Sequence, residues 1–271
     1  MRFVELLKDM TSKKKIVTAD NWDSLKKFTD ARISLGRCGT SLPLKESLAF
    51  KLAHAQAKDA VHKSFQRETL IRKIESQGYS CISLKSQVEN RNEYLTRPDL
   101  GRQLDTASLE KVIQNAPKKC DISFIICDGL SVRAIHENGL IFFTEFMNTL
   151  KETPLTLAPV CLVTYGRVAI ADEIGAVLNA TLSIVLIGER PGLSAPNSMG
   201  IYLTYAPKVG NTDEVRNCIS NIRPGGMTHQ AAVQKLSYLL EKAYMLRKTG
   251  VQLKDSMPSF YLPFSELIEL Q

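Results

Sequence analysis

The 271-residue sequence lacks the short motifs that usually identify a nucleotide site or a hydrolase. No G-x-G-x-x-G occurs, which argues against a nicotinamide or flavin dehydrogenase with a Rossmann fingerprint. No G-x-x-x-x-G-K followed by serine or threonine occurs, so a P-loop is excluded as a motif, and H-E-x-x-H and G-x-S-x-G are absent too. The four histidines are scattered and indicate no metal site: His54, His62, His136 and His229.

Paired cysteines, aromatic residues and long apolar runs are also scarce. The six cysteines form no C-x-x-C pair, which is typical of reduced cytosolic thiols. Aromatic residues make up 7% of the chain and the net charge of +7 is spread along it, so a nucleic-acid interface is not favoured. The longest apolar run, Leu155–Tyr165, is too short to span a bilayer, and charged residues interrupt Met1–Met10, so no signal peptide is expected. We therefore expect a cytoplasmic protein.

The composition that remains, 44% hydrophobic and 23% charged, is that of an ordinary globular protein. Residues 1–15 are predicted to form an amphipathic leader and tether, which either packs on its own domain or docks on a partner. Residues 16–78 are predicted to be a helical N-terminal segment, with a long helix that begins after Pro43. Three leucines recur every four residues on that helix: Leu44, Leu48 and Leu52.

Residues 79–255 alternate between short apolar runs and helical stretches. The strand candidates are Cys81–Leu84, Ile122–Cys127, Val160–Tyr165, Leu182–Ile187 and Ile201–Tyr205. Helices are predicted over Leu109–Asn115, Val132–Thr149 and Val168–Leu178, and from Thr228 to about Lys248 with Gly250 as a stop. This alternation predicts an α/β fold with a doubly wound parallel sheet. The tail, residues 256–271, has no predicted role.

Glycine-flanked polar residues follow three of the predicted strands, at Asp128–Ser131, Gly166–Arg167 and Gly188–Gly192. Because ligands of such sheets bind beyond the carboxyl ends of the strands, we expect these loops to share one ligand-binding edge. They contain no evident nucleophile, acid or metal site. They suit a ligand larger than a nucleotide and rich in amide groups, with glycines for close backbone approach and Glu189 to accept from amide N–H groups.

Several ordered blocks of this sequence resemble the light chain of ethanolamine ammonia-lyase. They are Ala31–Arg37, Ala53–Val61, Asp128–Ser131, Arg167–Ile170, Asp172–Gly175, Leu186–Leu193 and Cys218–Ile222, within a resemblance that covers roughly residues 30–255. The resemblance implies a Rossmann-like body beside the barrel of a heavy chain, with adenosylcobalamin at the interface. It implies cofactor contacts at Val168, Glu189 and Cys218. The ordinary alternatives are helix-face core for Val168, a solvated loop acid for Glu189 and a small buried hydrophobe for Cys218.

The same resemblance implies that the chain is one subunit of a large hetero-oligomer that also contains the heavy subunit. Ethanolamine would be converted to acetaldehyde and ammonia by a radical mechanism, with no catalytic residue on this chain and no activity when it is alone. The N-terminal segment would dock on the heavy chain, and the leader would direct the enzyme to a bacterial microcompartment. No D-x-H-x-x-G is present, as expected if the benzimidazole of the cofactor stays its lower cobalt ligand. A stand-alone nucleotide or small-molecule enzyme and a ligand-free interaction module remain as alternatives.

Overall fold

The structure, a computed structural model, describes residues 16–268. The predicted leader therefore lies outside the described residues. The chain divides into two compact units, residues 1–56 and 57–271, and each is described by itself. No helix among the described residues is long and apolar enough to cross a membrane.

The first unit ends within the long helix that was predicted after Pro43. It has a short 3-10 helix η1 (Asp23–Lys27) and irregular chain up to α2 (Leu44–His62), which begins directly after Pro43 as expected. An antiparallel bridge between Thr18 and Arg37 holds the irregular part together. Three side chains of α2 form an exposed apolar stripe, with 72% of Leu44, 55% of Leu48 and 61% of Leu52 accessible to solvent.

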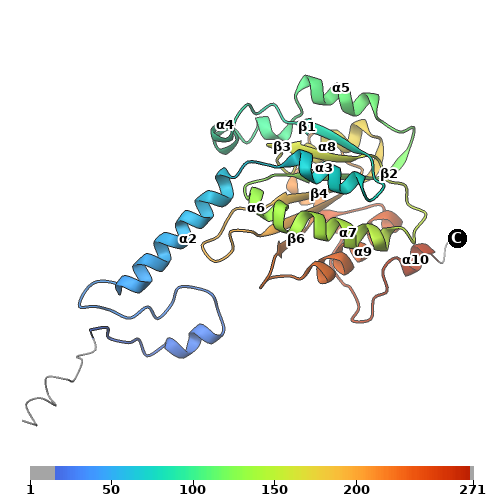
Figure 1. The fold of residues 1–271 in the computed structure, drawn as a ribbon. Coiled ribbons are helices and arrows are strands. Elements are labelled where there is room, and N and C mark those ends of the chain that lie inside the picture. The colour runs from blue at the N-terminus through green and yellow to red at the C-terminus, as the bar shows by residue number, and fades with distance from the viewer. Residues whose placement is uncertain (1–15, 269–271) are drawn as a thin grey trace, which may run out of the picture. The chain divides into compact units, whose positions relative to one another are not determined.

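The second unit is built on one six-stranded sheet with the order β1-β3-β2-β4-β5-β6 (Figure 1). The strands are β1 (Cys81–Lys85), β2 (Cys120–Cys127), β3 (Val160–Thr164), β4 (Ala180–Gly188), β5 (Met199–Tyr205) and β6 (Arg216–Ile222). The helices are α3 (Arg67–Glu75), α4 (Arg91–Thr96), α5 (Thr106–Gln114), α6 (Val132–Ala134), α7 (Leu140–Leu150), α8 (Ile170–Val177), α9 (His229–Leu246) and α10 (Ser265–Ile268). A π-helical turn, Ile135–Gly139, joins α6 to α7, and short 3-10 turns lie at Leu100–Arg102, Asp213–Val215 and Gly250–Gln252.

The α/β class is confirmed, but the sheet is mixed and not wholly parallel. The strands β1, β3, β2 and β4 are parallel, as predicted, whereas β5 pairs antiparallel with both β4 and β6. Only the loop of residues 189–198 joins β4 to β5, and a loop without a crossover helix returns the chain in the opposite direction. A Rossmann-like arrangement is not confirmed, because the Rossmann order is 3-2-1-4-5-6. The last strand, β6, was not predicted.

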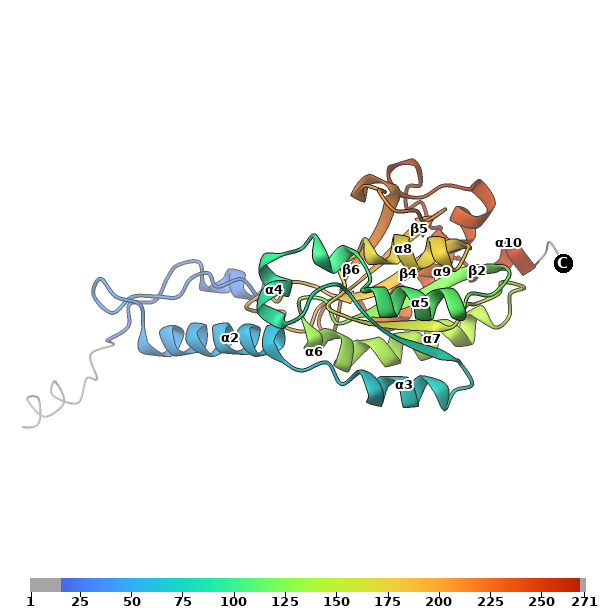
Figure 2. The same cartoon turned by 90° about the horizontal axis from the view of Figure 1, so that it is seen from above.

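Helices cover both faces of the sheet (Figure 2). The helices α5 and α8 pack on one face, over a core that includes Ile125, Val163 and Val185. The other face carries α3, α7 and α9 over a larger core that includes Phe124 and Phe146. The buried strands are mostly apolar for this reason, and all eight residues of β2 are buried. On the first face, α8 packs over β2 and β4.

The C-terminal part differs from prediction in two respects. Thr228 caps α9 as expected, by accepting from the Ala231 N–H, but the helix ends at Leu246, with Arg247 left-handed at φ 55°. Gly250 was therefore wrongly predicted as the stop. It is needed where the chain passes the Glu214–Val215 backbone, since an added Cβ would lie 1.9 Å from the Glu214 carbonyl oxygen.

The tail, for which the sequence predicted no role, packs on α9 through a buried carboxylate. Glu241 is 0% exposed and accepts three hydrogen bonds, from the Tyr261 hydroxyl at 2.8 Å and the backbone N–H groups of Glu266 and Leu267 at 2.8 and 3.1 Å. Phe264 is fully buried beside them. The tail therefore closes one end of the larger core.

Candidate cofactor-binding face

The loops after β2, β3 and β4 share one edge of the sheet, as the sequence predicted. The Tyr165 N–H, after β3, donates to Oδ1 of Asp128, after β2, at 2.8 Å. The Leu130 N–H donates to the Gly188 carbonyl oxygen, at the end of β4, at 2.9 Å. A side chain at Gly188 would place a Cβ 2.0 Å from the Ser131 carbonyl oxygen, so glycine permits the close approach of these two loops.

A buried ion pair fixes this edge. Asp128 is 1% exposed, and its Oδ2 lies 3.6 Å from Nη1 of Arg91. Arg91 also donates to the carbonyl oxygens of Gly129 and Leu130, at 2.9 and 2.7 Å. Burial raises the pKa of Asp128 to about 7, although the Arg91 guanidinium opposes the shift.

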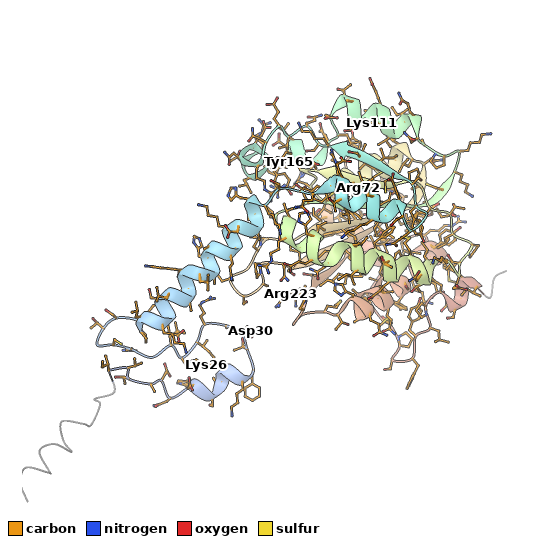
Figure 3. The ribbon with its side chains drawn as sticks, in the orientation of Figure 1. Lys26, Asp30, Arg72, Lys111, Tyr165 and Arg223 are labelled. Carbon is orange, nitrogen blue, oxygen red and sulfur yellow. The ribbon has the colours of Figure 1, made fainter. Side chains whose placement is uncertain are left out.

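Tyr94 connects that ion pair to the start of α8. The guanidinium groups of Arg91 and Arg167 lie 4.7 and 4.0 Å from the centre of its ring, and its hydroxyl donates to the Gly166 carbonyl oxygen at 3.0 Å. Tyr165, labelled in Figure 3, has a left-handed backbone with φ 61°. These contacts fix the turn that leads into Val168.

Glu189 is held by two hydroxyl donors, one from the residue before β5 and one from β6. Its Oε2 accepts from the Ser198 hydroxyl and its Oε1 from the Ser220 hydroxyl, both at 2.5 Å. The register of β5 and β6 shifts near Gly200, and Asn221 in β6 has φ 63°, which directs its N–H toward Glu189 at 3.4 Å. An added Cβ on Gly200 would lie 2.9 Å from Oε1 of Glu189. Glu189 is thus an oriented, half-buried carboxylate and not a solvated loop acid.

Cys218 lies on the same surface. It is exposed on β6 opposite Tyr202 of β5, while its neighbour Ile219 is buried in the core on the other side of the sheet. The interpretation of Cys218 as a buried hydrophobe is therefore wrong. We call the surface formed by Glu189, Tyr202, Cys218 and Ser220, with Gly200 buried beneath Glu189, the β5–β6 face.

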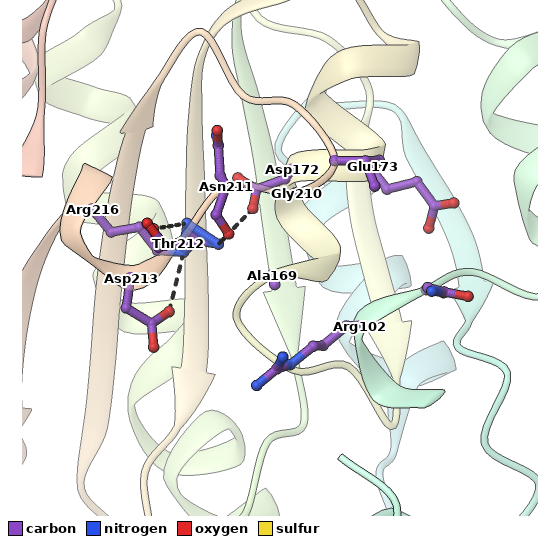
Figure 4. Close-up of a pocket in the computed structure, with 11 residues that line it drawn as sticks. Arg102, Ala169, Asp172, Glu173, Gly210, Asn211, Thr212, Asp213 and Arg216 are labelled. Atoms are coloured by element: carbon purple, nitrogen blue, oxygen red, sulfur yellow. Dashed lines mark hydrogen bonds and ion pairs between the residues drawn. The ribbon is translucent and has the colours of Figure 1, made fainter. Parts of the chain in front are cut away.

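Val168 stands apart from this pair. It immediately precedes the Ala169 cap of α8, is half-buried, and packs against the core beneath α8. The start of α8 and the start of β6 border one cavity of about 720 Å³, which Ala169 and Arg216 both line (Figure 4). The structure thus brings Glu189 and Cys218 together and places Val168 at the neighbouring helix.

Sequence reasoning missed four residues that shape this face: Ser198, Gly200, Tyr202 and Ser220. The apolar signal in Arg216–Ile222 was weak, because its core residues Ile219 and Ile222 stand three positions apart and do not alternate. The bulge at Asn221 interrupts the two-residue period of that segment, so its pattern does not predict a strand.

We predict that Asp128→Asn changes the pH dependence of stability. The pKa of Asp128 is about 7 in the folded chain and ordinarily 3.8, so its stabilising contribution is complete below about pH 4 and is lost as pH rises to about 7. The neutral amide cannot lose a proton. The free energy of unfolding of the variant should therefore rise relative to wild type by roughly 2–4 kcal/mol between pH 4 and 8.

Urea unfolding at several pH values measures this difference, with the exposed carboxylate of Asp99 replaced by asparagine as the control. Parallel profiles for Asp128→Asn and wild type would contradict the raised pKa.

Comparison with known proteins agrees with the resemblance seen in the sequence. The profile of the family described as ethanolamine ammonia-lyase light chain (EutC) matches residues 19–254. The ethanolamine ammonia-lyase small subunit of Ralstonia nicotianae is 46% identical over 243 residues, which cover 89% of this chain and 90% of that protein. The small subunit of Pseudomonas putida strain W619 is 47% identical over 246 residues, with the same coverage. That of Xanthomonas campestris pv. campestris strain ATCC 33913 is 46% identical over 239 residues, covering 87% of this chain and 88% of that protein. The chain therefore belongs to the ethanolamine ammonia-lyase light-chain family.

Proposed function

We propose that this chain is the light subunit of an adenosylcobalamin-dependent ethanolamine ammonia-lyase and forms one side of the cobalamin site against a heavy subunit. The reaction would convert ethanolamine to acetaldehyde and ammonia by a radical mechanism. Family membership supports the subunit role, because the relatives are named small subunits of that lyase. The observation that carries the cofactor assignment is the β5–β6 face, where an oriented carboxylate and an exposed thiol lie together.

The residues of this face fit a corrin, which is a broad ring with peripheral amides. Cys218 is exposed and its side chain is short, so a flat group can approach β6 closely at this position. Tyr202 adds a half-buried aromatic side chain. Glu189 supplies carboxylate oxygens, which accept hydrogen bonds from amide N–H groups.

When bound, adenosylcobalamin supplies the radical chemistry. The residues of this chain bind and orient. Glu189, held by Ser198 and Ser220, would accept from a peripheral amide, while Val168 and Cys218 would pack against apolar parts of the ligand and exclude water. We assign no catalytic residue to this chain, so the substrate site would belong to the heavy subunit.

Co-expression of the chain with a heavy subunit tests this proposal. The purified complex should release acetaldehyde from ethanolamine only when adenosylcobalamin is added, and the chain alone should release none, because it would hold only one side of the site. An enzyme-coupled assay of acetaldehyde measures both. Turnover by the isolated chain, or by the complex without the cofactor, would overturn the assignment.

Two substitutions test the role of Glu189 from different directions. Glu189→Ala removes the carboxylate, and Gly200→Ala places a methyl group 2.9 Å from its Oε1, which the flexible Glu189 side chain can avoid only by moving. Each should weaken cobalamin binding to the complex by about tenfold, equivalent to about 1.4 kcal/mol. Titration followed by the visible spectrum of cobalamin gives the affinity. The control is Glu145→Ala, on the exposed side of α7. If Glu189→Ala and Gly200→Ala lower the cobalamin affinity no more than this control does, the role of Glu189 is structural only.

We further propose that residues 16–78 dock on the heavy subunit, and that the α2 stripe of Leu44, Leu48 and Leu52 is the contact. Each of these side chains is more than half exposed, and burying a leucine stabilises an interface by roughly 1.5–3 kcal/mol. A microcompartment location for the enzyme rests on Met1–Met10 and stays a prediction.

Replacing all three stripe leucines by alanine should weaken subunit assembly by at least about a hundredfold, since alanine keeps the helix but removes the apolar surface. Analytical ultracentrifugation of the mixed subunits measures assembly. The control is the double variant Lys45→Ala, Lys51→Ala, which alters exposed charges on the same helix. Equal assembly of the leucine variant and the control would exclude this stripe as the contact.

A further inference from the structure

The loop that joins β4 to β5 begins with Glu189 and ends with Ser198. These two residues are bonded to each other twice. The Glu189 N–H donates to the Ser198 carbonyl oxygen at 3.0 Å, and the Ser198 hydroxyl donates to Oε2 of Glu189 at 2.5 Å. The position of the Glu189 carboxylate therefore depends on the last part of the loop, residues 196–198, which we call the returning segment.

Two side chains from outside the loop hold the returning segment. The Ser131 hydroxyl, at the start of α6, donates to the Pro196 carbonyl oxygen at 2.6 Å. The side-chain NH₂ of Asn138 donates to the Asn197 carbonyl oxygen at 2.9 Å. With the bond to the Ser198 carbonyl oxygen, all three carbonyl groups of the returning segment accept from a fixed donor. The segment thus has a defined position beside Glu189.

Asn138 is suited to this contact because each part of its side-chain amide is used. It is 1% exposed, and its NH₂ group donates to the Ala134 carbonyl oxygen at 3.1 Å as well as to Asn197. Its Oδ1 lies 3.1 Å from Nε2 of His229, and since Oδ1 can only accept, this ring nitrogen is the donor. A carboxylate could not donate to the two carbonyl groups, and an apolar side chain would leave all three partners unsatisfied.

The π-helical turn Ile135–Gly139 presents two consecutive residues to Asn197. Asn138 donates to its carbonyl oxygen, and Oε2 of Glu137 accepts from its side-chain NH₂ at 2.6 Å. Such turns are rare and occur mostly as single insertions in α-helices, frequently at functional sites. The only ligand-contacting candidate that these bonds lead to is Glu189, at the other end of the same loop.

We propose that Asn138 and Glu137 are positioning residues of the cofactor site, which act on the ligand through Glu189. They hold Asn197, and the returning segment in turn holds Ser198 against the Glu189 carboxylate. The inference rests on the proposed function and on the role that it gives to Glu189. It extends the site to a helix whose residues do not belong to the β5–β6 face.

A double-mutant cycle tests whether Asn138 acts through Glu189. Cyanocobalamin is titrated into the two-subunit complex, followed by its visible spectrum, for wild type, Asn138→Ala, Glu189→Ala and the double variant. Asn138→Ala should weaken binding by about fivefold, because the returning segment loses a buried hydrogen bond and Glu189 loses its fixed position. Added to Glu189→Ala, the same change should weaken binding by less than about twofold, since the carboxylate that it positions is already absent.

Glu137→Ala gives a second cycle at an exposed residue, where the variant should fold. It removes the acceptor of the Asn197 amide, so we expect a loss of about threefold that is again absent when Glu189 is alanine. This cycle decides the question if Asn138→Ala does not fold. The control is Leu150→Ala, which truncates a buried side chain at the far end of α7 and should leave the affinity within about twofold of wild type.

The possible failures are distinguishable. Losses that multiply, to about fiftyfold for Asn138→Ala combined with Glu189→Ala, would show that the π-helical turn supports the fold and does not act through Glu189. Single variants that bind no more weakly than Leu150→Ala would overturn the inference as well. An unchanged affinity of Glu189→Ala would overturn the role of Glu189 and this inference with it, whereas failure of cyanocobalamin to bind the wild-type complex would overturn the proposed function.

Discussion

The hydrogen bonds to Glu189 connect the ends of three strands, and the β5–β6 face depends on them. Glu189 follows β4, Ser198 precedes β5 and Ser220 lies in β6, so one carboxylate sets the spacing of these segments at the sheet edge. The bulge in β6 adds the Asn221 N–H as a further donor. Because the donors hold the carboxylate in place, a ligand that accepts this geometry does not have to order a flexible side chain on binding.

Close backbone approach is the second constraint on this edge. Gly188 lets the ends of β2 and β4 meet, and Gly200 leaves the space that the Glu189 carboxylate occupies. The buried pair of Asp128 and Arg91 then fixes the loops after β2 and β3. A buried ion pair is weak support for stability, because desolvation offsets much of the attraction. Its value here is the defined position that it gives to the turn before α8.

The sequence predicted the parallel half of the sheet well, for a physical reason. Strands buried on both faces are mostly apolar, and β2 and β4 are recognisable from the apolar runs that they contain. The strand β5 was predicted from its apolar run, but its direction depends on a loop without a helix and was not. The strand β6 is half exposed and bulged, so it lacks this signature. Gly250 was misread because a glycine needed for close approach resembles a helix stop.

The candidate site was only partly predictable. Val168, Glu189 and Cys218 came from resemblance to a family, and the structure adds that Glu189 and Cys218 share one face with Ser220. The hydrogen bond from Asn138 to the Asn197 carbonyl oxygen joins residues 59 positions apart, and no local pattern indicates it. Such contacts arise from the order of the strands, which a single sequence does not specify.

The most direct test of this account is a structure of the two-subunit complex with bound cobalamin, determined by cryo-electron microscopy. The account predicts that the corrin lies over Tyr202 and Cys218, with Glu189 in contact with a peripheral amide. A corrin bound on the opposite side of the sheet, against α7 and α9, or bound without contact to this chain, would contradict it.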